Sequence, residues 1–323
     1  MRFGNINLTH GLFLAPMAGV TDRAFRALCV EYGAECVTTE LISAKAVTLG
    51  ADKTLALASL GDDERPAGIQ IFGSDPEIMA RAACMLGSLS PDFIDINMGC
   101  PVHKLIRSGE GCALMRDPER AGEITAAVVR ESSVPVTVKM RLGMTGDTVN
   151  APEVAVCCEQ AGASAVTVHG RTRDMFYSGV SDCEGIRRVK EKVSIPVVAS
   201  GDIGIRFGVR EALSLTGADG TAVGRAAMGA PWVFEALLAE YEDRPARAIS
   251  DSEKLSVIMR HIDRLCEFGG ERSLVQLRTH LAWYSHGCRG AAGVRRRLGT
   301  AVTRNDYESI AASIFSGDGV PGR

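Results

Sequence analysis

The sequence predicts an α/β fold, a (β/α)8 TIM barrel followed by a small C-terminal helical bundle. Short apolar runs recur from Leu12 to about Gly224 at spacings of about 25 to 35 residues, and helical patterns separate them. Eight such units favour closure into a parallel barrel over a doubly wound sheet, because no GxGxxG motif follows the first strand. The predicted strands are Leu12–Leu14, Cys36–Thr39, Ala67–Ile71, Phe93–Ile96, Pro135–Lys139, Ala165–Val168, Pro196–Ala199 and Gly220–Val223.

The segments between these strands carry the start signals of helices. Several of them open with a proline after a polar residue, and proline is common in the first turn of a helix. The predicted helices include Pro76–Leu86, Pro118–Glu131, Pro152–Ala161 and Gly204–Leu215.

The composition is typical of a close-packed α/β protein. Of the 323 residues, 46% are hydrophobic but only 5% are aromatic, and 35 are glycine. The ten cysteines include no CxxC pair and no His/Cys spacing of the zinc type, so we expect no metal. The start of the chain is polar, and no run of 18 apolar residues occurs. We therefore expect a soluble, cytoplasmic monomer with reduced thiols and no contact with a membrane.

Candidate ligand-binding residues follow every predicted strand and are polar at all but the first, which is the strongest indication of a functional site. In a parallel barrel the carboxyl ends of all strands meet at one end, here called the mouth, where ligands bind. Core packing alone rarely places polar groups at so many strand ends. The residues at these ends are Pro16–Ala18, Glu40, Gln70, Asn97 with Cys100, Lys139 with Arg141, His169 with Arg171, Ser200–Asp202 and Gly224 with Arg225.

The last two strand ends have the composition of a phosphate site. Glycines at 201 and 224 allow backbone N–H groups to approach a phosphate, and Arg225 offers a fixed positive fork. A ligand anchored there extends over the barrel toward Lys139, which suits an anionic group such as a reduced flavin. The alternative for Lys139 is an ion pair with a barrel carboxylate such as Glu40.

The segment from Asp95 to Lys104 presents an amide and a thiol at a set spacing. Asn97 ends an apolar strand and offers both a donor and an acceptor to a planar heterocycle. Cys100 lies on a turn between Gly99 and Pro101. The alternative is a buried cysteine at the end of a core strand, since cysteine is among the most buried residue types.

The composition changes after the eighth strand. Residues 243–250 have the composition of a linker, and 251–315 are helical in pattern. Residues 244–323 hold 13 Lys and Arg against 8 Asp and Glu, a net charge of +5, which leaves −8 for residues 1–243. The stretch 272–305 contains seven arginines and no acid, with aromatic residues between them. This pattern indicates a polyanion site in a second domain, residues 243–323, beside a catalytic domain of residues 1–242.

Several of these segments together resemble the tRNA-dihydrouridine synthases, most of all their bacterial B-type branch. The similarity runs from the first strand into the C-terminal helices, where 278–284 (RTHLAWY) resembles the tRNA-binding helical domain of that family. Ser200 stands where the family usually has asparagine, and Cys183 where tryptophan is common. The other matching segments are 14–26 (LAPMAGVTDRAFR), 95–101 (DINMGCP), 139–143 (KMRLG), 168–173 (VHGRTR) and 201–203 (GDI).

The resemblance implies a role for each matching residue. Cys100 would be the general acid that protonates the target uracil, opposite the hydride from reduced FMN, with NADPH as the electron donor. FMN would be bound by Pro16, Met17, Ala18, Gln70, Lys139, His169, Ser200, Gly201, Asp202, Gly224 and Arg225. The tRNA would be bound by Asn97, Arg141, Arg171, Arg278, Arg295, Arg296 and Arg297.

The function that the resemblance implies is therefore the reduction of uridines in tRNA to 5,6-dihydrouridine. One alternative is a flavin barrel that acts on a free small molecule, in the manner of a dihydroorotate dehydrogenase, for which an arginine-rich tail has no use. Another is a non-catalytic tRNA-binding protein, which would not need Cys100, Lys139 and Arg225 together.

Overall fold

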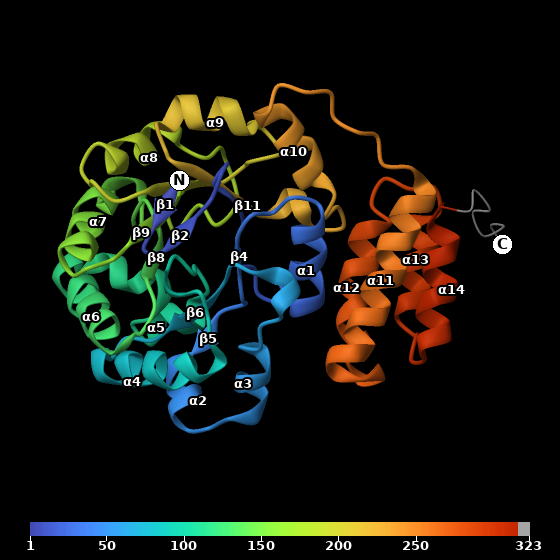
Figure 1. Ribbon diagram of the computed structural model, residues 1–323, viewed down its shortest axis with the longest axis horizontal. Coiled ribbons are helices and arrows are strands. Elements are labelled where there is room, and N and C mark those ends of the chain that lie inside the picture. The colour runs from blue at the N-terminus through green and yellow to red at the C-terminus, as the bar shows by residue number, and fades with distance from the viewer. Residues whose placement is uncertain (316–323) are drawn as a thin grey trace.

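The computed structural model of the protein describes residues 1–315 and shows a closed parallel barrel with a group of helices beside it (Figure 1). All eight predicted strands are present, and each pairs in parallel with its neighbours. The ring closes where Phe13 and Cys36 form a bridge, and β5 (Ile42–Ser43) is added beside β6. The barrel strands are β3 (Leu12–Leu14), β4 (Val37–Thr38), β6 (Ala67–Phe72), β7 (Phe93–Met98), β8 (Val136–Arg141), β9 (Ala165–His169), β10 (Val197–Ser200) and β11 (Gly220–Val223).

Several strands run further than the sequence predicts. Asn97, Arg141 and His169 lie inside strands, whereas the prediction places them just after the strand ends. Asn97 lies opposite Lys139 in the ladder, and Arg141 lies opposite His169. Because the hydrogen-bonded ladder holds their backbones, these side chains are more rigid than loop residues would be.

A ring of helices covers the outside of the barrel (Figure 1). Predicted and observed bounds agree for α4 and α6, where Asp75 and Asp117 cap the helices. The predicted helix 204–215 begins later, because the carbonyl of Asp202 first accepts three N–H groups in a tight turn. The ring comprises α1 (Arg23–Glu31), α2 (Ala44–Thr48), α3 (Asp52–Leu57), α4 (Pro76–Leu86), α5 (His103–Arg107), α6 (Pro118–Glu131), α7 (Ala151–Gln160), α8 (Cys183–Lys190), α9 (Val209–Thr216) and α10 (Val233–Tyr241).

A short hairpin closes the end of the barrel opposite the mouth. It consists of β1 (Arg2–Phe3) and β2 (Ile6–Asn7). Phe3 packs edge-on against Phe93, the first residue of β7, with ring centroids 5.5 Å apart. Ligands can therefore enter the barrel only from the carboxyl ends of the strands.

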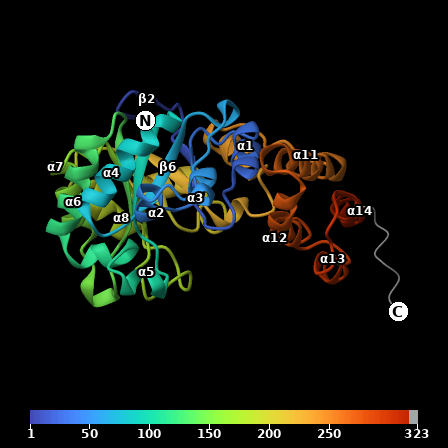
Figure 2. The same ribbon diagram turned by 90° about the horizontal axis from the view of Figure 1, so that it is seen from below.

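The C-terminal residues 251–315 are helical, as predicted, and lie to one side of the barrel (Figures 1 and 2). They form α11 (Asp251–Gly269), α12 (Leu274–Tyr284), α13 (Ala291–Leu298) and α14 (Arg304–Phe315), after the irregular predicted linker. The last eight residues of the predicted second domain, 316–323, lie outside the described residues. None of the helices within 1–315 is long and apolar enough to span a membrane.

Within the barrel, helix α1 is the main contact for α11, which also packs on α14. The guanidinium groups of Arg260 and Arg264 both pair with Glu31 at the end of α1. The guanidinium carbon of Arg23 lies 3.8 Å from the centroid of the Phe268 ring. Charged and aromatic groups thus join the helices to the first βα unit of the barrel.

Candidate active site

The mouth of the barrel contains a cavity of about 630 Å³, within the size range of small-molecule and cofactor sites. All eleven residues predicted to bind the cofactor line it, and so do Asn97, Cys100 and Arg141. Arg171, Arg278, Arg295, Arg296 and Arg297 do not line it. The cavity therefore brings together the strand-end residues but not the arginines of the helical region.

A chain of buried hydrogen bonds connects three strands beneath this cavity. The carboxylate of Asp95 accepts from Gln70 Nε2 at 2.7 Å and from the Thr137 hydroxyl at 2.6 Å. Gln70 Oε1 in turn accepts from Asn97 Nδ2 at 2.8 Å. We call Asp95, Gln70 and Asn97 the amide relay. Since an ionised carboxylate only accepts hydrogen bonds, Asp95 sets the direction of both amides.

The amide relay ends on the turn that carries Cys100. Asn97 Oδ1 accepts from the backbone N–H of Cys100 at 2.9 Å and of Gly99 at 3.2 Å. The oxygen predicted to meet the substrate is therefore occupied within the protein. Asn97 holds the Cys100 turn in place, and its remaining amide hydrogen is the group it can offer to a ligand.

Cys100 is a half-buried thiol on the cavity wall. Burial raises the pKa of this thiol above its usual value, while the Val102 backbone N–H and the charges of Arg141 and Lys139 partly oppose the rise. The thiol is consequently protonated at neutral pH and can donate a proton.

Lys139 and His169 present nitrogen atoms to the same cavity. Within residues 1–315 Lys139 forms no ion pair, and the Glu40 carboxylate instead accepts from the Gly19 N–H. Burial and the charge of Arg141 lower the pKa of Lys139 to about 8. Burial, together with the charges of Lys139 and Arg141, holds the pKa of His169 well below its usual value, and its Nδ1 is buried without a partner among residues 1–315. These nitrogens are available to an anionic, planar ligand.

Asp202 connects two arginines near the predicted phosphate site. Its carboxylate pairs with Arg171 at 2.7 Å and with Arg225 at 2.8 Å. Arg171 is only 1% exposed and also donates to the carbonyls of Ser178 and Gly179, so it offers little surface to RNA. Its contact with the nucleotide stays a prediction, and its bonds favour a role in holding Asp202. Arg171 holds Asp202, and Asp202 holds Arg225, which remains 38% exposed.

Arg141 supports the loop above the cavity. Its guanidinium donates to three backbone carbonyls, those of Gly99, Thr172 and Phe176. The side chain is 3% exposed, although it reaches the cavity wall. Arg141 therefore links the Cys100 turn to the loop after β9, and its charge also favours a nearby anion.

Sequence reasoning missed several residues of the site. Asp95 could have been noticed as a lone carboxylate in an otherwise apolar strand. Phe176 and Tyr177, from the loop after β9, line the cavity, and so do Thr279 and Trp283 of α12. No sequence pattern indicates that a residue near position 280 lies beside strands that end before position 225. The place of Thr279 and Trp283 in the cavity wall is therefore known only from the tertiary structure.

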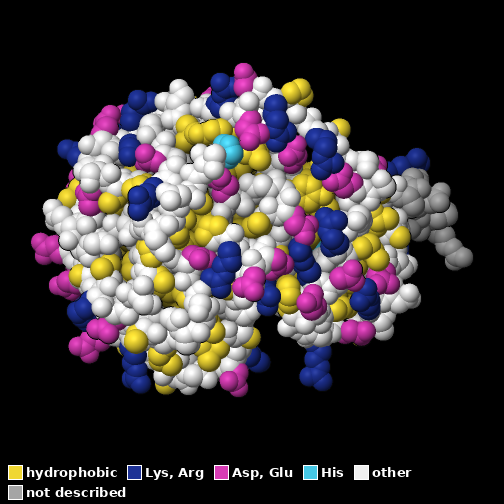
Figure 3. Space-filling view, viewed as in Figure 1, with side chains coloured by type: hydrophobic (Ala, Val, Ile, Leu, Met, Phe, Trp, Pro, Cys, Tyr) yellow, Lys and Arg dark blue, Asp and Glu magenta, His cyan; other side chains and the backbone are white. Residues whose placement is uncertain are grey.

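The seven arginines of the acid-free stretch are not equivalent. Arg278 donates to Tyr307 and Ala301, Arg297 to Ser309 and Ser313, and Arg304 pairs with Asp263 and Glu308. Basic and acidic side chains are mixed over the helical region on the face shown in Figure 3. The arginines that are exposed and form no ion pair within residues 1–315 are Arg272, Arg289, Arg295 and Arg296.

The fold and the cavity define the class of the protein, a parallel (β/α)8 barrel with a cavity at its mouth. An old yellow enzyme homologue from Zymomonas mobilis superposes with a TM-score of 0.53 at 12% identity, covering 79% of this chain and 94% of that one. Morphinone reductase superposes with a TM-score of 0.53 at 12% identity, covering 78% and 90%. At such low identity these similarities concern the fold alone.

The sequence comparisons define the family more narrowly. The family described as "Dihydrouridine synthase (Dus)" matches residues 13–315. The tRNA-dihydrouridine synthase B of Pseudomonas aeruginosa is 41% identical over 303 residues, 92% of this chain and 90% of that protein. A probable tRNA-dihydrouridine synthase of Rickettsia bellii is 41% identical over 300 residues, 91% of each chain. The chain belongs to the dihydrouridine synthase family and is similar to its B-type members, which confirms the resemblance noted in its motifs.

Proposed function

We propose that this protein reduces specific uridines of tRNA to 5,6-dihydrouridine in the cytoplasm, with bound FMN and with NADPH as the electron donor. The family and the printed names of the relatives support the substrate. The observation that carries the proposal is the composition of the cavity. It is lined both by the protonated thiol of Cys100 and by the ammonium of Lys139, which forms no ion pair within residues 1–315.

The residues around the cavity fit FMN. The orphaned Nδ1 of His169 and the ammonium of Lys139 would bind the ring system, together with Gln70. Arg225, held by Asp202, would bind the phosphate beside the backbone of Ser200, Gly201 and Gly224. At Gly201, where φ is +112°, a Cβ atom would lie 2.5 Å from the Ser181 hydroxyl, so only glycine fits at this part of the cavity wall. The edge of the ring would lie against Pro16, Met17 and Ala18.

The protein groups supply the proton and the positioning. FMN bound in this cavity would, once reduced by NADPH, supply a hydride to one carbon of the uracil C5–C6 bond. Cys100 donates the proton to the other carbon, and the amide relay and Arg141 hold the turn from which it does so. The target base must leave the RNA stack to reach this cavity, as in other enzymes that act on a base.

The proposal is tested by following the two halves of the reaction separately. The purified protein is expected to be yellow and to release FMN, not FAD, on denaturation. In Cys100→Ala, NADPH should still reduce the flavin, but its reoxidation by unmodified tRNA should slow by about 10²–10⁴-fold. Cys84→Ala, at an exposed cysteine on α4, is the matched control and should reoxidise at the parental rate.

Two results would contradict the proposal. A colourless protein that takes up no flavin would exclude this chemistry. Reoxidation by a free pyrimidine such as orotate but not by tRNA would favour the small-molecule alternative. Mapping dihydrouridine in tRNA from cells that lack the gene would identify the modified positions.

A further inference from the structure

Helix α12 has two functional faces. Thr279 and Trp283, four residues apart and hence on one side of the helix, line the cavity. His280 follows Thr279 in the chain and Tyr284 follows Trp283. Both of these side chains are buried against the barrel and α11. Gly229, at a φ of +69°, packs so closely on this helix that a Cβ atom would lie 2.4 Å from the Trp283 carbonyl carbon. The position of α12 thus directly determines the shape of the cavity.

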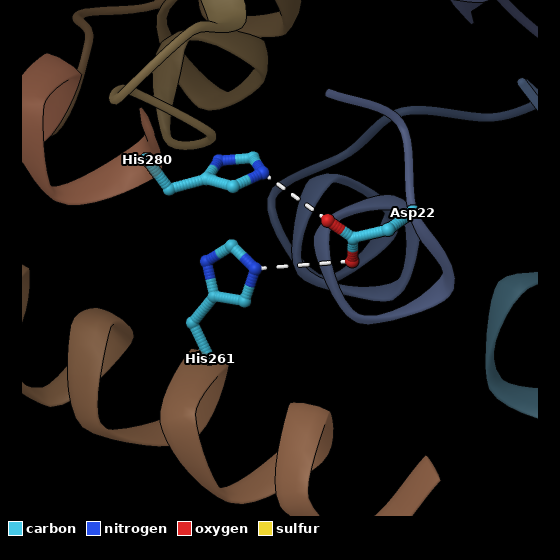
Figure 4. A group of neighbouring side chains, drawn as sticks. All are labelled: Asp22, His261 and His280. Atoms are coloured by element: carbon cyan, nitrogen blue, oxygen red, sulfur yellow. Dashed lines mark hydrogen bonds and ion pairs between the residues drawn. The ribbon is translucent and has the colours of Figure 1, made fainter. Parts of the chain in front are cut away.

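The buried face of α12 is held by a polar group, shown in Figure 4. His280 Nε2 lies 3.1 Å from one oxygen of Asp22, and His261 Nε2 of α11 lies 3.9 Å from the other. Asp22 also caps α1 by accepting from the Phe25 N–H at 3.0 Å. We call Asp22, His261 and His280 the interdomain latch. Both histidines are fully buried, so any change in this contact must move α11 or α12 relative to the barrel.

Two hydrogen bonds hold the latch, while His261 Nε2 and His280 Nδ1 are buried without a hydrogen-bond partner within residues 1–315. The Tyr284 hydroxyl lies 3.3 Å from His261 Nδ1 and can donate to it, which leaves the Nε2–H of His261 directed at Asp22. The Nε2–H of His280 is directed at the other carboxylate oxygen. All three ligand atoms lie within 4.8 Å of one another, and His261 Nε2 lies 3.9 Å from its Asp22 oxygen, farther than the about 3.3 Å between ligands of a zinc ion with bonds of about 2 Å.

We propose that Trp283 is a substrate-positioning residue whose indole stacks on a base of the RNA at the cavity wall, and that the interdomain latch holds α12 so that it can do so. The indole is half-buried, lies on the wall shared with Cys100, and packs edge-on against the His280 ring, 5.3 Å between centroids. A half-buried indole on a cavity wall offers an aromatic face to a base, and such stacking tolerates any base. This inference rests on the proposed function, because it needs RNA to enter the mouth.

Fluorescence gives a test that is independent of catalysis. The chain has two tryptophans, so Trp232→Phe leaves Trp283 as the single reporter. Saturating unmodified tRNA is expected to quench this emission, because a stacked base contacts the indole. If tRNA binds in a gel-shift assay but leaves the emission unchanged, the proposal is overturned while the proposed function stands. If tRNA does not bind at all, the proposed function itself fails.

Matched variants on α12 separate stacking from helix stability. Trp283→Ala should lower the rate of flavin reoxidation at subsaturating tRNA by about 10-fold or more, whereas Trp283→Phe should retain most of it. Val275→Ala, at an exposed position of the same helix, should have no effect. NADPH reduction of the flavin should be unchanged in Val275→Ala, and in the Trp283 variants it should fall by less than tRNA-dependent reoxidation. Equal losses in the Ala and Phe variants, or a loss in the Val275 variant, would show that Trp283 acts only through folding.

The latch is tested by combining variants. Asp22→Asn keeps an oxygen to cap α1 but removes the charge that both histidines face, so tRNA-dependent reoxidation should fall. If the latch acts through Trp283, then Asp22→Asn should cause little further loss in the Trp283→Ala background. Fully additive losses would overturn the connection. Elemental analysis of the purified protein should find no stoichiometric metal. If it finds one zinc ion per chain, and this ion is lost in His261→Gln, the three residues form a metal site and not a hydrogen-bonded latch.

Discussion

Replacing Asp95 with leucine tests whether the amide relay positions the catalytic turn. The carboxylate accepts from Gln70 at 2.7 Å and from Thr137 at 2.6 Å, and it is only 4% exposed. Leucine has a similar size but accepts no hydrogen bond. The amide of Gln70 then loses its fixed direction, and through Asn97 so does the turn that presents Cys100.

The expected magnitude follows from the contacts that are lost. A buried donor left without an acceptor costs about 1–3 kcal/mol, so we expect the free energy of unfolding in urea to fall by about that amount. A shift of about 1 Å in a catalytic group typically slows a reaction by about 10²-fold, which is the loss we expect in tRNA-dependent flavin reoxidation. Because Lys139 and Arg225 would still hold the flavin, flavin content should fall by less than the reoxidation rate, although Gln70 loosens.

Asparagine at position 95 provides the matched control. Its amide oxygen can accept from Gln70 while its amide nitrogen donates to the Thr137 hydroxyl, which can reverse its role. Asp95→Asn should therefore recover most of the activity and stability that Asp95→Leu loses. Parental reoxidation rates and parental stability in the leucine variant would refute the idea that the relay positions Cys100.

Three other predictions follow from contacts in the mouth and the helical region. Arg225→Ala should weaken FMN retention in equilibrium dialysis, and unchanged affinity would remove Arg225 from the phosphate site. The double variant Arg295→Ala with Arg296→Ala should reduce the slope of log K for tRNA binding against log salt by about 0.7–1.8, whereas Arg297→Ala, whose guanidinium binds serines of α14, should leave the slope unchanged. Burial holds the pKa of His261 at about 4 in the folded protein against about 6.5 in the unfolded chain, so stability is complete above pH 6.5 and is lost as the pH falls toward 4. The free energy of unfolding should then be lower by about 2 kcal/mol at pH 5 than at pH 7, with a smaller difference in His261→Gln.

The sequence by itself determined the number of barrel strands and most of the mouth. Apolar runs mark buried strands whatever their partners are, and parallel strands bring their carboxyl ends together by topology alone. Gln70, Asn97, Cys100, Lys139 and Arg225 could therefore be assigned to one cavity before any contact was known, and all five line it.

The tertiary structure decided which polar groups remain free for a ligand. Arg171 looked like a nucleotide contact, and Arg304 looked unpaired in an acid-free stretch. Arg171 pairs with Asp202, 31 residues away, and Arg304 pairs with Asp263, 41 residues away, as well as with Glu308 in its own helix. The spacing of charges along the chain does not predict such pairs, because hydrogen bonds and ion pairs form between groups that folding brings together.

The same reason explains why the sequence did not indicate the interdomain latch. The sequence around Asp22 indicates a helix cap, and His280 is one of several aromatic residues in a basic segment. Yet His280 Nε2 lies 3.1 Å from a carboxylate oxygen of Asp22, although 258 positions separate the two residues in the chain. Local patterns determine strands, helices and caps, since these depend on neighbours in the chain. The packing of α12 on the barrel, and with it the place of Trp283 in the cavity wall, depends on surfaces that exist only once both parts have folded.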